Sequence, residues 1–127
     1  MMFDGILSRR IEVCRLLVSM RVVLGDALGF SVCANPIWDM LLDLYLARHE
    51  GREVYLWPLC IASHCPLSTA YRKVSFMEKQ GLVVRLNATR NKRRINVAMT
   101  DQGQATMDNI LDRMTDRVFD LSPDQRV

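Results

Sequence analysis

The chain has 127 residues, of which 50% are hydrophobic and 24% are charged, so it can form one domain with a buried core. This balance excludes the disordered and fibrous classes of protein. Charged residues interrupt the N-terminal hydrophobic stretch, so we expect neither a membrane span nor a signal peptide in it. The sequence therefore predicts a single cytoplasmic domain over residues 1–127.

The overall net charge of +3 conceals a strongly basic segment. Between Val54 and Thr100 there are eight Lys or Arg residues and one acid, Glu78, which gives this segment a charge of +7. The rest of the chain carries −4. A basic lobe favours a polyanionic partner, because counterions released from phosphates supply binding free energy. A solvated basic face without a partner is the alternative.

The first predicted helix spans residues 3–28 and has an unusually broad apolar face. One apolar row is enough to dock a helix on its own core, so two adjacent rows indicate contact with a second copy of the chain. Complete burial within one protomer is the alternative. The rows are Leu7, Ile11, Cys14, Val18 and Val22, and Val13, Leu17, Met20, Leu24 and Leu28.

Three more helices are predicted from capping residues and helix-breaking residues. A brief extended piece at residues 54–56 separates the first from the second. In the third, Ala70, Val74 and Met77 are predicted to face inward. The helices are bounded by Asn35-Pro36 and Gly51, by Trp57-Pro58 and His64-Cys65-Pro66, and by Leu67 or Ser68 and Gly81.

Two strand-like runs follow, at residues 82–86 and 95–99, joined by a polar and basic loop of hairpin length. Thr100-Asp101-Gln102-Gly103 then begins a last helix, which has an apolar face and an acidic column. The apolar face consists of Met107, Ile110, Leu111, Met114 and Val118, and the column of Asp108, Asp112, Asp116 and Asp120.

Two short helices joined by a tight turn and followed by a basic hairpin form the order of a winged helix-turn-helix. Three segments carry a more specific resemblance: Asn35-Pro36-Ile37-Trp38 through Tyr45, Leu59-Cys60-Ile61-Ala62-Ser63-His64-Cys65-Pro66-Leu67-Ser68-Thr69-Ala70-Tyr71-Arg72 through Met77-Glu78-Lys79-Gln80-Gly81-Leu82-Val83, and Asn91-Lys92-Arg93-Arg94-Ile95-Asn96-Val97-Ala98-Met99-Thr100-Asp101-Gln102-Gly103. Together they resemble the MarR family of bacterial transcriptional regulators over residues 35–114.

The resemblance implies a mainly α fold with a small β-hairpin wing. It places the DNA-binding lobe at residues 35–100, with N- and C-terminal dimerisation helices at residues 1–30 and 101–120. Three departures from the family pattern bear on the turn, the wing and the dimer. His64 stands where a turn glycine is common, Asn91 and Lys92 replace the usual Asp-Arg, and the C-terminal helical region is short.

The resemblance also implies a homodimer that binds double-stranded DNA, with site residues that have a physical rationale. Hydroxyl and N–H groups at a helix N-terminus suit a phosphate, an arginine one turn in can reach guanine, and a basic hairpin suits the minor groove or backbone. The recognition helix has Ser68, Thr69, Tyr71, Arg72 and Lys73, the wing has Arg90, Lys92, Arg93 and Arg94, and the dimer interface has Leu7, Ile11, Cys14, Val18, Ile110, Leu111, Met114 and Val118.

Cysteine spacing does not fit a disulfide framework or a zinc site, so we predict no metal and no cofactor. Cys60 and Cys65 are predicted to be core thiols, while oxidation sensing through Cys14 or Cys33 stays open. A small-molecule effector also stays open, because Trp38, Tyr45 and Trp57 would suit either a pocket or the core.

No catalytic constellation is visible in the sequence, so we do not expect an enzyme. The predicted function is sequence-specific DNA binding in transcription regulation. The alternatives are a winged-helix module that binds protein without reading DNA, and a redox-sensing regulator of the same fold.

Overall fold

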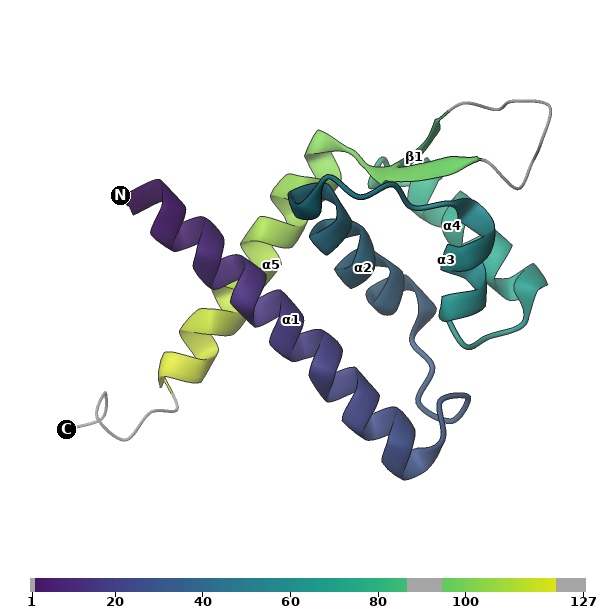
Figure 1. Ribbon diagram of the computed structural model, residues 1–127, viewed down its shortest axis with the longest axis horizontal. Helices are drawn as coiled ribbons and strands as arrows, with labels where there is room; N and C mark the ends of the chain where they lie inside the picture. Colours follow the sequence, from purple (N-terminus) through teal and green to yellow (C-terminus); the bar gives the residue numbers. More distant parts are fainter. Residues whose placement is uncertain (1, 87–94, 121–127) are drawn as a thin grey trace.

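Figure 1 shows the computed structural model of the protein, which describes residues 2–86 and 95–120. Within these residues, five helices accompany one small antiparallel sheet, which lies at an edge of the molecule, and the predicted order of elements and the predicted fold class are confirmed. The elements are α1 Met2–Leu28, α2 Pro36–Glu50, α3 Leu56–Ala62, α4 Leu67–Lys79, β1 Val83–Leu86, β2 Asn96–Met99 and α5 Asp101–Asp120.

Helix α2 lies at the centre of the fold and packs against α1, α4, α5 and β2. Pro36 occupies its first turn, where a missing N–H costs no helical hydrogen bond. Met40, Leu42 and Leu44 are all buried, because α2 is enclosed on several sides. Burial of this helix therefore fixes the positions of α4, the hairpin and the long α1 relative to one another.

The two strands form a hairpin with the register Val83↔Met99 to Leu86↔Asn96. The extended piece predicted at residues 54–56 joins its other edge through an isolated bridge between Tyr55 and Asn96. Leu56 N–H donates to the Ile95 carbonyl and Val97 N–H donates to the Val54 carbonyl, both at 2.8 Å. The chain before α3 is thus fastened to the base of the hairpin.

The turn between α3 and α4 has His64 in the left-handed region, with φ of 60°. The His64 ring stacks on the Phe30 ring, with centroids 4.5 Å apart. Phe30 also lies against Gly25 of α1, where an added Cβ would meet the ring at 2.0 Å. These three residues connect the end of α1 to the helix-turn-helix turn.

Helix α5 begins at a side-chain cap and crosses α1 (Figure 1). The Thr100 hydroxyl accepts a hydrogen bond from Gly103 N–H at 2.9 Å and donates to the Gly81 carbonyl at 2.5 Å. One side chain therefore joins the start of α5 to the chain that follows α4. No helix in the described part of the chain is long and apolar enough to cross a membrane.

The acidic column of α5 is partly occupied by contacts within the protomer. Arg10 of α1 binds Asp112 with both ends of its guanidinium group, at 2.9 and 2.8 Å, and lies 3.4 Å from Asp108. The Tyr45 hydroxyl donates to Asp108 at 2.6 Å. Two of the predicted acidic residues therefore hold α5 to α1 and α2, a role that spacing along α5 alone does not predict.

Candidate nucleic-acid interface

Helix α4, the candidate recognition helix, has one face buried in the lobe and the opposite face exposed to solvent. Ala70, Val74 and Met77 have no exposed surface, as the sequence predicts, and they fix α4 against the rest of the lobe. The opposite face is left for contact with another molecule. This division follows the 3.6-residue repeat of the sequence.

The predicted recognition residues lie on α4 but differ in their surroundings. Ser68 and Arg72 are exposed, whereas Thr69, Tyr71 and Lys73 are half-buried. The Tyr71 ring meets Trp57 of α3 edge to face, with centroids 6.0 Å apart. Tyr71 therefore helps to pack α3 against α4, and Ser68 and Arg72 are the most accessible of the five.

A hollow of about 410 Å³ lies along the open face of α4. Thr69, Arg72 and Lys73 line it together with Phe76 and with Ile37 from the start of α2. Sequence reasoning missed Phe76, which is 52% exposed. Its position four residues after Arg72 is the signal that could have placed it on the same face.

Positive charge on α4 is not neutralised within the described residues. There, neither Arg72 nor Lys73 has an ion pair or a hydrogen bond, so their charges are open to an anionic partner. Glu78, the one acid between residues 54 and 100, lies 3.6 Å from the Arg85 guanidinium. Arg85 also donates to the Ser75 hydroxyl at 2.7 Å.

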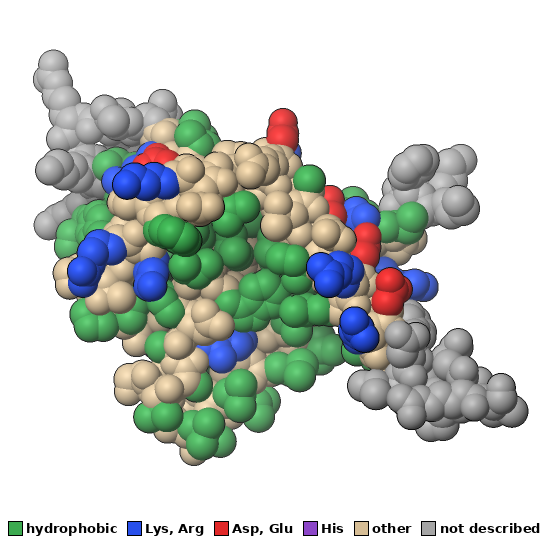
Figure 2. All heavy atoms as spheres, turned by 180° about the vertical axis from the view of Figure 1, so that it is seen from behind, with side chains coloured by type: hydrophobic (Ala, Val, Ile, Leu, Met, Phe, Trp, Pro, Cys, Tyr) green, Lys and Arg blue, Asp and Glu red, His purple; other side chains and the backbone are tan. Residues whose placement is uncertain are grey.

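Figure 2 shows Lys and Arg side chains on the lobe built by α3 and α4, on the face opposite to that of Figure 1. Hydrophobic side chains cover much of the middle of the same face. The predicted wing residues Arg90, Lys92, Arg93 and Arg94 lie outside the described residues. The wing therefore stays a prediction from the sequence.

The predicted dimer residues fall into three groups. Ile11, Cys14 and Leu111 are buried in the core of the protomer itself, so they are not available for contact with a partner protomer. The half-buried residues are Val18 and Ile110, and the exposed ones are Leu7, Met114 and Val118.

The apolar surface left open on α1 includes residues of the predicted rows and others outside them. Leu16 and Val23, one heptad apart, are 59% and 66% exposed. Met20 and Leu28 are also open to solvent. Apolar surface on α1 thus remains after the protomer has folded. Leu7, Val22 and Leu24 of the predicted rows also belong to it, whereas α2 and α5 cover Ile11 and Cys14.

The buried thiols are in surroundings that oppose thiolate formation. Burial raises the pKa of Cys14 to about 11, and burial likewise raises the pKa of Cys60. Cys14 also lies 3.6 Å from the Leu42 carbonyl, to which its thiol can donate. Because reactive cysteines have depressed pKa values, this environment disfavours oxidation sensing by these two residues.

Cys65 is only half-buried, beside the Ser63 hydroxyl at 3.1 Å, so the prediction of two fully buried core thiols holds for Cys60 alone. All four cysteines are free thiols. Among the residues described, no group of three or more His, Cys, Asp or Glu side chains could hold a metal ion.

Tyr45 belongs to the core, because its side chain is almost completely buried. Burial and the hydrogen bond to Asp108 both raise its pKa. Trp38 and Trp57 are half-buried on different helices. Tyr45 is therefore a packing residue, and no effector role follows from the three aromatic residues together.

No family model and no curated protein matches the chain. Among solved structures, AF1382 from Archaeoglobus fulgidus matches 60% of this chain and 80% of its own length, with 20% sequence identity and a TM-score of 0.50. The match shows a shared fold over that part of the chain.

Two other solved structures match nearly all of the chain. RV1404 from Mycobacterium tuberculosis covers 98% of this chain and 84% of its own, at 19% identity and a TM-score of 0.49. A structure named MarR covers 99% of this chain and 88% of its own, at 25% identity and a TM-score of 0.49.

Proposed function

We propose that this protein is a transcriptional regulator of the MarR type, which binds double-stranded DNA as a homodimer. The open face of α4 would enter the major groove, and the basic segment at residues 87–94 would contact the minor groove or the backbone. The observation that carries the proposal is that α4 is held by three buried side chains while Arg72 and Lys73 have no partner among the described residues.

Charge supports a nucleic acid as the partner rather than a neutral surface. The lobe from Val54 to Thr100 has a charge of +7, and Arg85 already engages its one acid, Glu78. The closely spaced negative phosphates of a nucleic acid can bind to several of these basic side chains at once. In a two-fold symmetric dimer the two copies of α4 would reach half-sites about 34–36 Å apart, one turn of DNA.

Duplex titrations of two variants at several salt concentrations test this proposal. Arg72→Ala should weaken the cognate duplex by about 1–3 kcal/mol and relax the preference at one position of each half-site, because a guanidinium there reads a base edge. Arg93→Ala should weaken cognate and scrambled duplexes alike and lower the salt slope by about one unit per phosphate contact.

Arg113→Ala is the matched control, because it removes one exposed arginine from α5, outside the basic lobe. It should leave both the affinity and the salt slope near those of the unsubstituted protein. If the Arg72→Ala and Arg93→Ala variants behaved like this control while remaining folded, the proposal of DNA binding would be wrong. The protein-interaction alternative would then replace it.

A further inference from the structure

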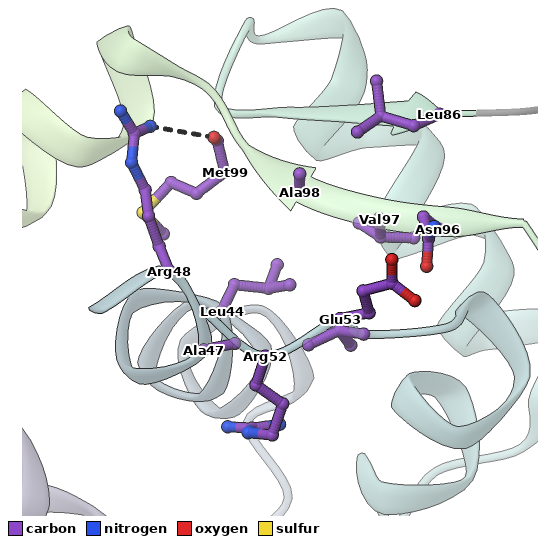
Figure 3. A pocket seen from close by; sticks show the side chains of 11 residues that line it. Leu44, Ala47, Arg48, Arg52, Glu53, Leu86, Asn96, Val97, Ala98 and Met99 are labelled. Carbon is purple, nitrogen blue, oxygen red and sulfur yellow. Dashed lines mark hydrogen bonds between the residues drawn. The ribbon is translucent and has the colours of Figure 1, made fainter. Parts of the chain in front are cut away.

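The hollow along the open face of α4 keeps its positive charge, unlike the pocket between the end of α2 and β2. In that pocket, Arg48 donates to the Met99 carbonyl at 3.0 Å (Figure 3) and to Asp101 at 2.6 Å. The hollow of α4 is lined by Arg72 and Lys73, which have no ion pair or hydrogen bond within the described residues. Among those residues, no acid lines the hollow. It therefore favours an anionic partner.

Phe76 adds an apolar group beside these charges. A single exposed apolar side chain is common on folded proteins, so its 52% exposure alone indicates no partner. Its position is the informative observation, because Ser68, Arg72 and Phe76 follow one another at intervals of four residues and are all exposed. A molecule that binds along this row therefore meets a hydroxyl, a guanidinium and a phenyl ring in turn.

Packing within the protomer accounts for only part of the Phe76 ring. Ile37, at the start of α2, lines the same hollow but is half-buried and packs against the core. Tyr71 of α4 pairs with Trp57 of α3, whereas Phe76 belongs to neither ring pair of the described residues. The fold therefore does not require an aromatic side chain at residue 76, and a variant with a smaller one should fold.

The C5-methyl group of thymine is the apolar feature of the base edges in the major groove of DNA, and phenylalanine is one of the side chains that contact it. The other groups on these edges are hydrogen-bond donors and acceptors, which a phenyl ring cannot satisfy. Arginine binds the O6 and N7 atoms of guanine. Arg72 and Phe76, one helical turn apart, are thus suited to a guanine and a thymine that lie close together.

We propose that Phe76 is a specificity-determining residue, which selects thymine by contacting its C5-methyl group in the major groove. This role rests on the proposed function, because it assigns Phe76 to one position of the duplex that α4 binds. Four residues of an α-helix advance about 6 Å, and successive bases of a strand are about 3.4 Å apart. The thymine therefore lies within about two base pairs of the position that Arg72 reads.

Removal of methyl groups from the duplex tests this role directly. The probe is a duplex selected from a random library with the unsubstituted chain, and each of its thymines is then replaced in turn by uracil. Uracil keeps the hydrogen-bonding groups of thymine but lacks the methyl group. We expect one thymine in each half-site at which the replacement weakens binding about fourfold, as for the loss of one buried methyl group. The absence of such a thymine from a duplex that the protein binds would overturn the role of Phe76.

Variants of Phe76 show whether the ring reads that methyl group. Phe76→Ala should bind the thymine and uracil duplexes equally, whereas Phe76→Leu, which keeps an apolar side chain, should retain part of the preference. Ile61→Ala is the matched control, because Ile61 is 63% exposed but lies on α3, and it should keep the whole preference. Phe76→Gln makes the same test should Phe76→Ala not fold. A preference that persists unchanged without the ring would show that another group reads the methyl.

Failure of the Phe76 role and failure of the proposed function give different results. If the unsubstituted chain binds no duplex, the proposed function is wrong and the role of Phe76 falls with it. If the chain binds duplexes but no thymine methyl affects its affinity, DNA binding stands and only the role of Phe76 is wrong. Arg72→Ala adds a positional check. A methyl-dependent thymine more than about two base pairs from the position that this variant relaxes would contradict the placement of Phe76.

Discussion

His64, which stands where a turn glycine is common in the MarR pattern, changes both the backbone and the contacts of the turn between α3 and α4. It occupies a left-handed conformation that a glycine would adopt without strain, with φ of 60°. Its ring stacks on Phe30, which provides an interaction that glycine lacks. The residue therefore combines an unfavourable backbone conformation with a favourable contact between the turn and the end of α1.

Substitutions of His64 by glycine and by alanine separate these two effects. Both remove the ring, but only His64→Ala keeps a Cβ in the left-handed region. We expect His64→Gly to be more stable than His64→Ala by about 1 kcal/mol in urea unfolding. Equal stability of the two variants would mean that the backbone conformation at His64 carries no such cost.

At the level of single residues, the sequence predicts which side chains of α4 are buried but not which polar atoms lack partners. Ala70, Val74 and Met77 follow from periodicity, because helical spacing alone determines their face. The buried Asn96 Oδ1 belongs to a residue that is bridged to Tyr55, some forty residues earlier in the chain. No local pattern contains that information.

At the scale of elements, the start of α5 lies very close to Leu82, the residue before β1, and to Met99 of β2. A Cβ added to Gly103 would lie 2.2 Å from the Leu82 carbonyl oxygen and 2.9 Å from Met99 Cγ. Thr100 also donates its backbone N–H to Leu82 at 3.0 Å. The absence of a side chain at Gly103 allows α5 to start directly on the hairpin.

The same glycine-to-alanine change should have opposite effects in α5 and α1. Gly103→Ala should lower the free energy of unfolding by about 1–3 kcal/mol, because relieving the overlap displaces backbone. Gly5 of α1 has nothing within 4 Å of an added Cβ, so Gly5→Ala should raise it by about 0.5–1 kcal/mol through helix propensity. Denaturant unfolding of both variants checks the signs, and a stabilising Gly103→Ala would contradict the packing described.

The contact between α1 and α5 gives the fold a dependence on acidic pH. The Arg10 guanidinium lowers the pKa of Asp112 by hydrogen bonding to its carboxylate. A lowered folded-state pKa adds stability above the ordinary pKa of aspartate, and this stability is lost as pH falls through the folded-state value. The relevant window therefore lies below about pH 4.

Arg10→Met should remove this dependence while keeping an unbranched side chain of similar length. We expect a loss of about 1 kcal/mol at neutral pH, allowing for the solvent exposure of Asp112, and a smaller loss at pH 3. Urea unfolding between pH 3 and 7 measures both values. Arg52→Met, which breaks the more exposed pair with Asp43, is the control and should change stability less. A loss that did not vary with pH would argue against a role for the Asp112 charge.

At the scale of the whole molecule, apolar surface remains on the two terminal helices of the protomer. Val23 of α1 and Val118 of α5 are 66% and 67% exposed. Large apolar side chains left exposed on a folded protomer favour an interface between protein chains. We therefore predict a homodimer in which α1 and α5 of one protomer meet those of its partner.

Light scattering at micromolar concentration tests this prediction. The unsubstituted protein should have twice the chain mass of 14.6 kDa, and Val23→Glu and Val118→Glu should each shift it toward the single-chain mass. Ile61→Glu is the control, because Ile61 is 63% exposed but lies on α3. A monomeric unsubstituted protein would show that the dimer prediction is wrong.

For the whole molecule, the order of the elements and their bounds to within one residue could be predicted because prolines, glycines and apolar periodicity are local signals. The cap predicted at Asn35 is wrong, since its side chain makes no cap hydrogen bond to α2. The position of the open apolar surface on α1 could be predicted only in part, because Met20 and Leu24 of the predicted rows are exposed but other members of the rows are buried. Ile11 and Cys14 are covered by elements that follow much later in the chain, whereas Leu16 and Val23 are not. Which row is covered depends on packing between distant segments.

The separation of the two faces of α4 has an evolutionary consequence. Its anchoring residues, Ala70, Val74 and Met77, are distinct from the exposed Ser68 and Arg72. Surface substitutions away from packing contacts usually change stability little. Mutations at Ser68 and Arg72 can therefore accumulate without passing through poorly folded intermediates.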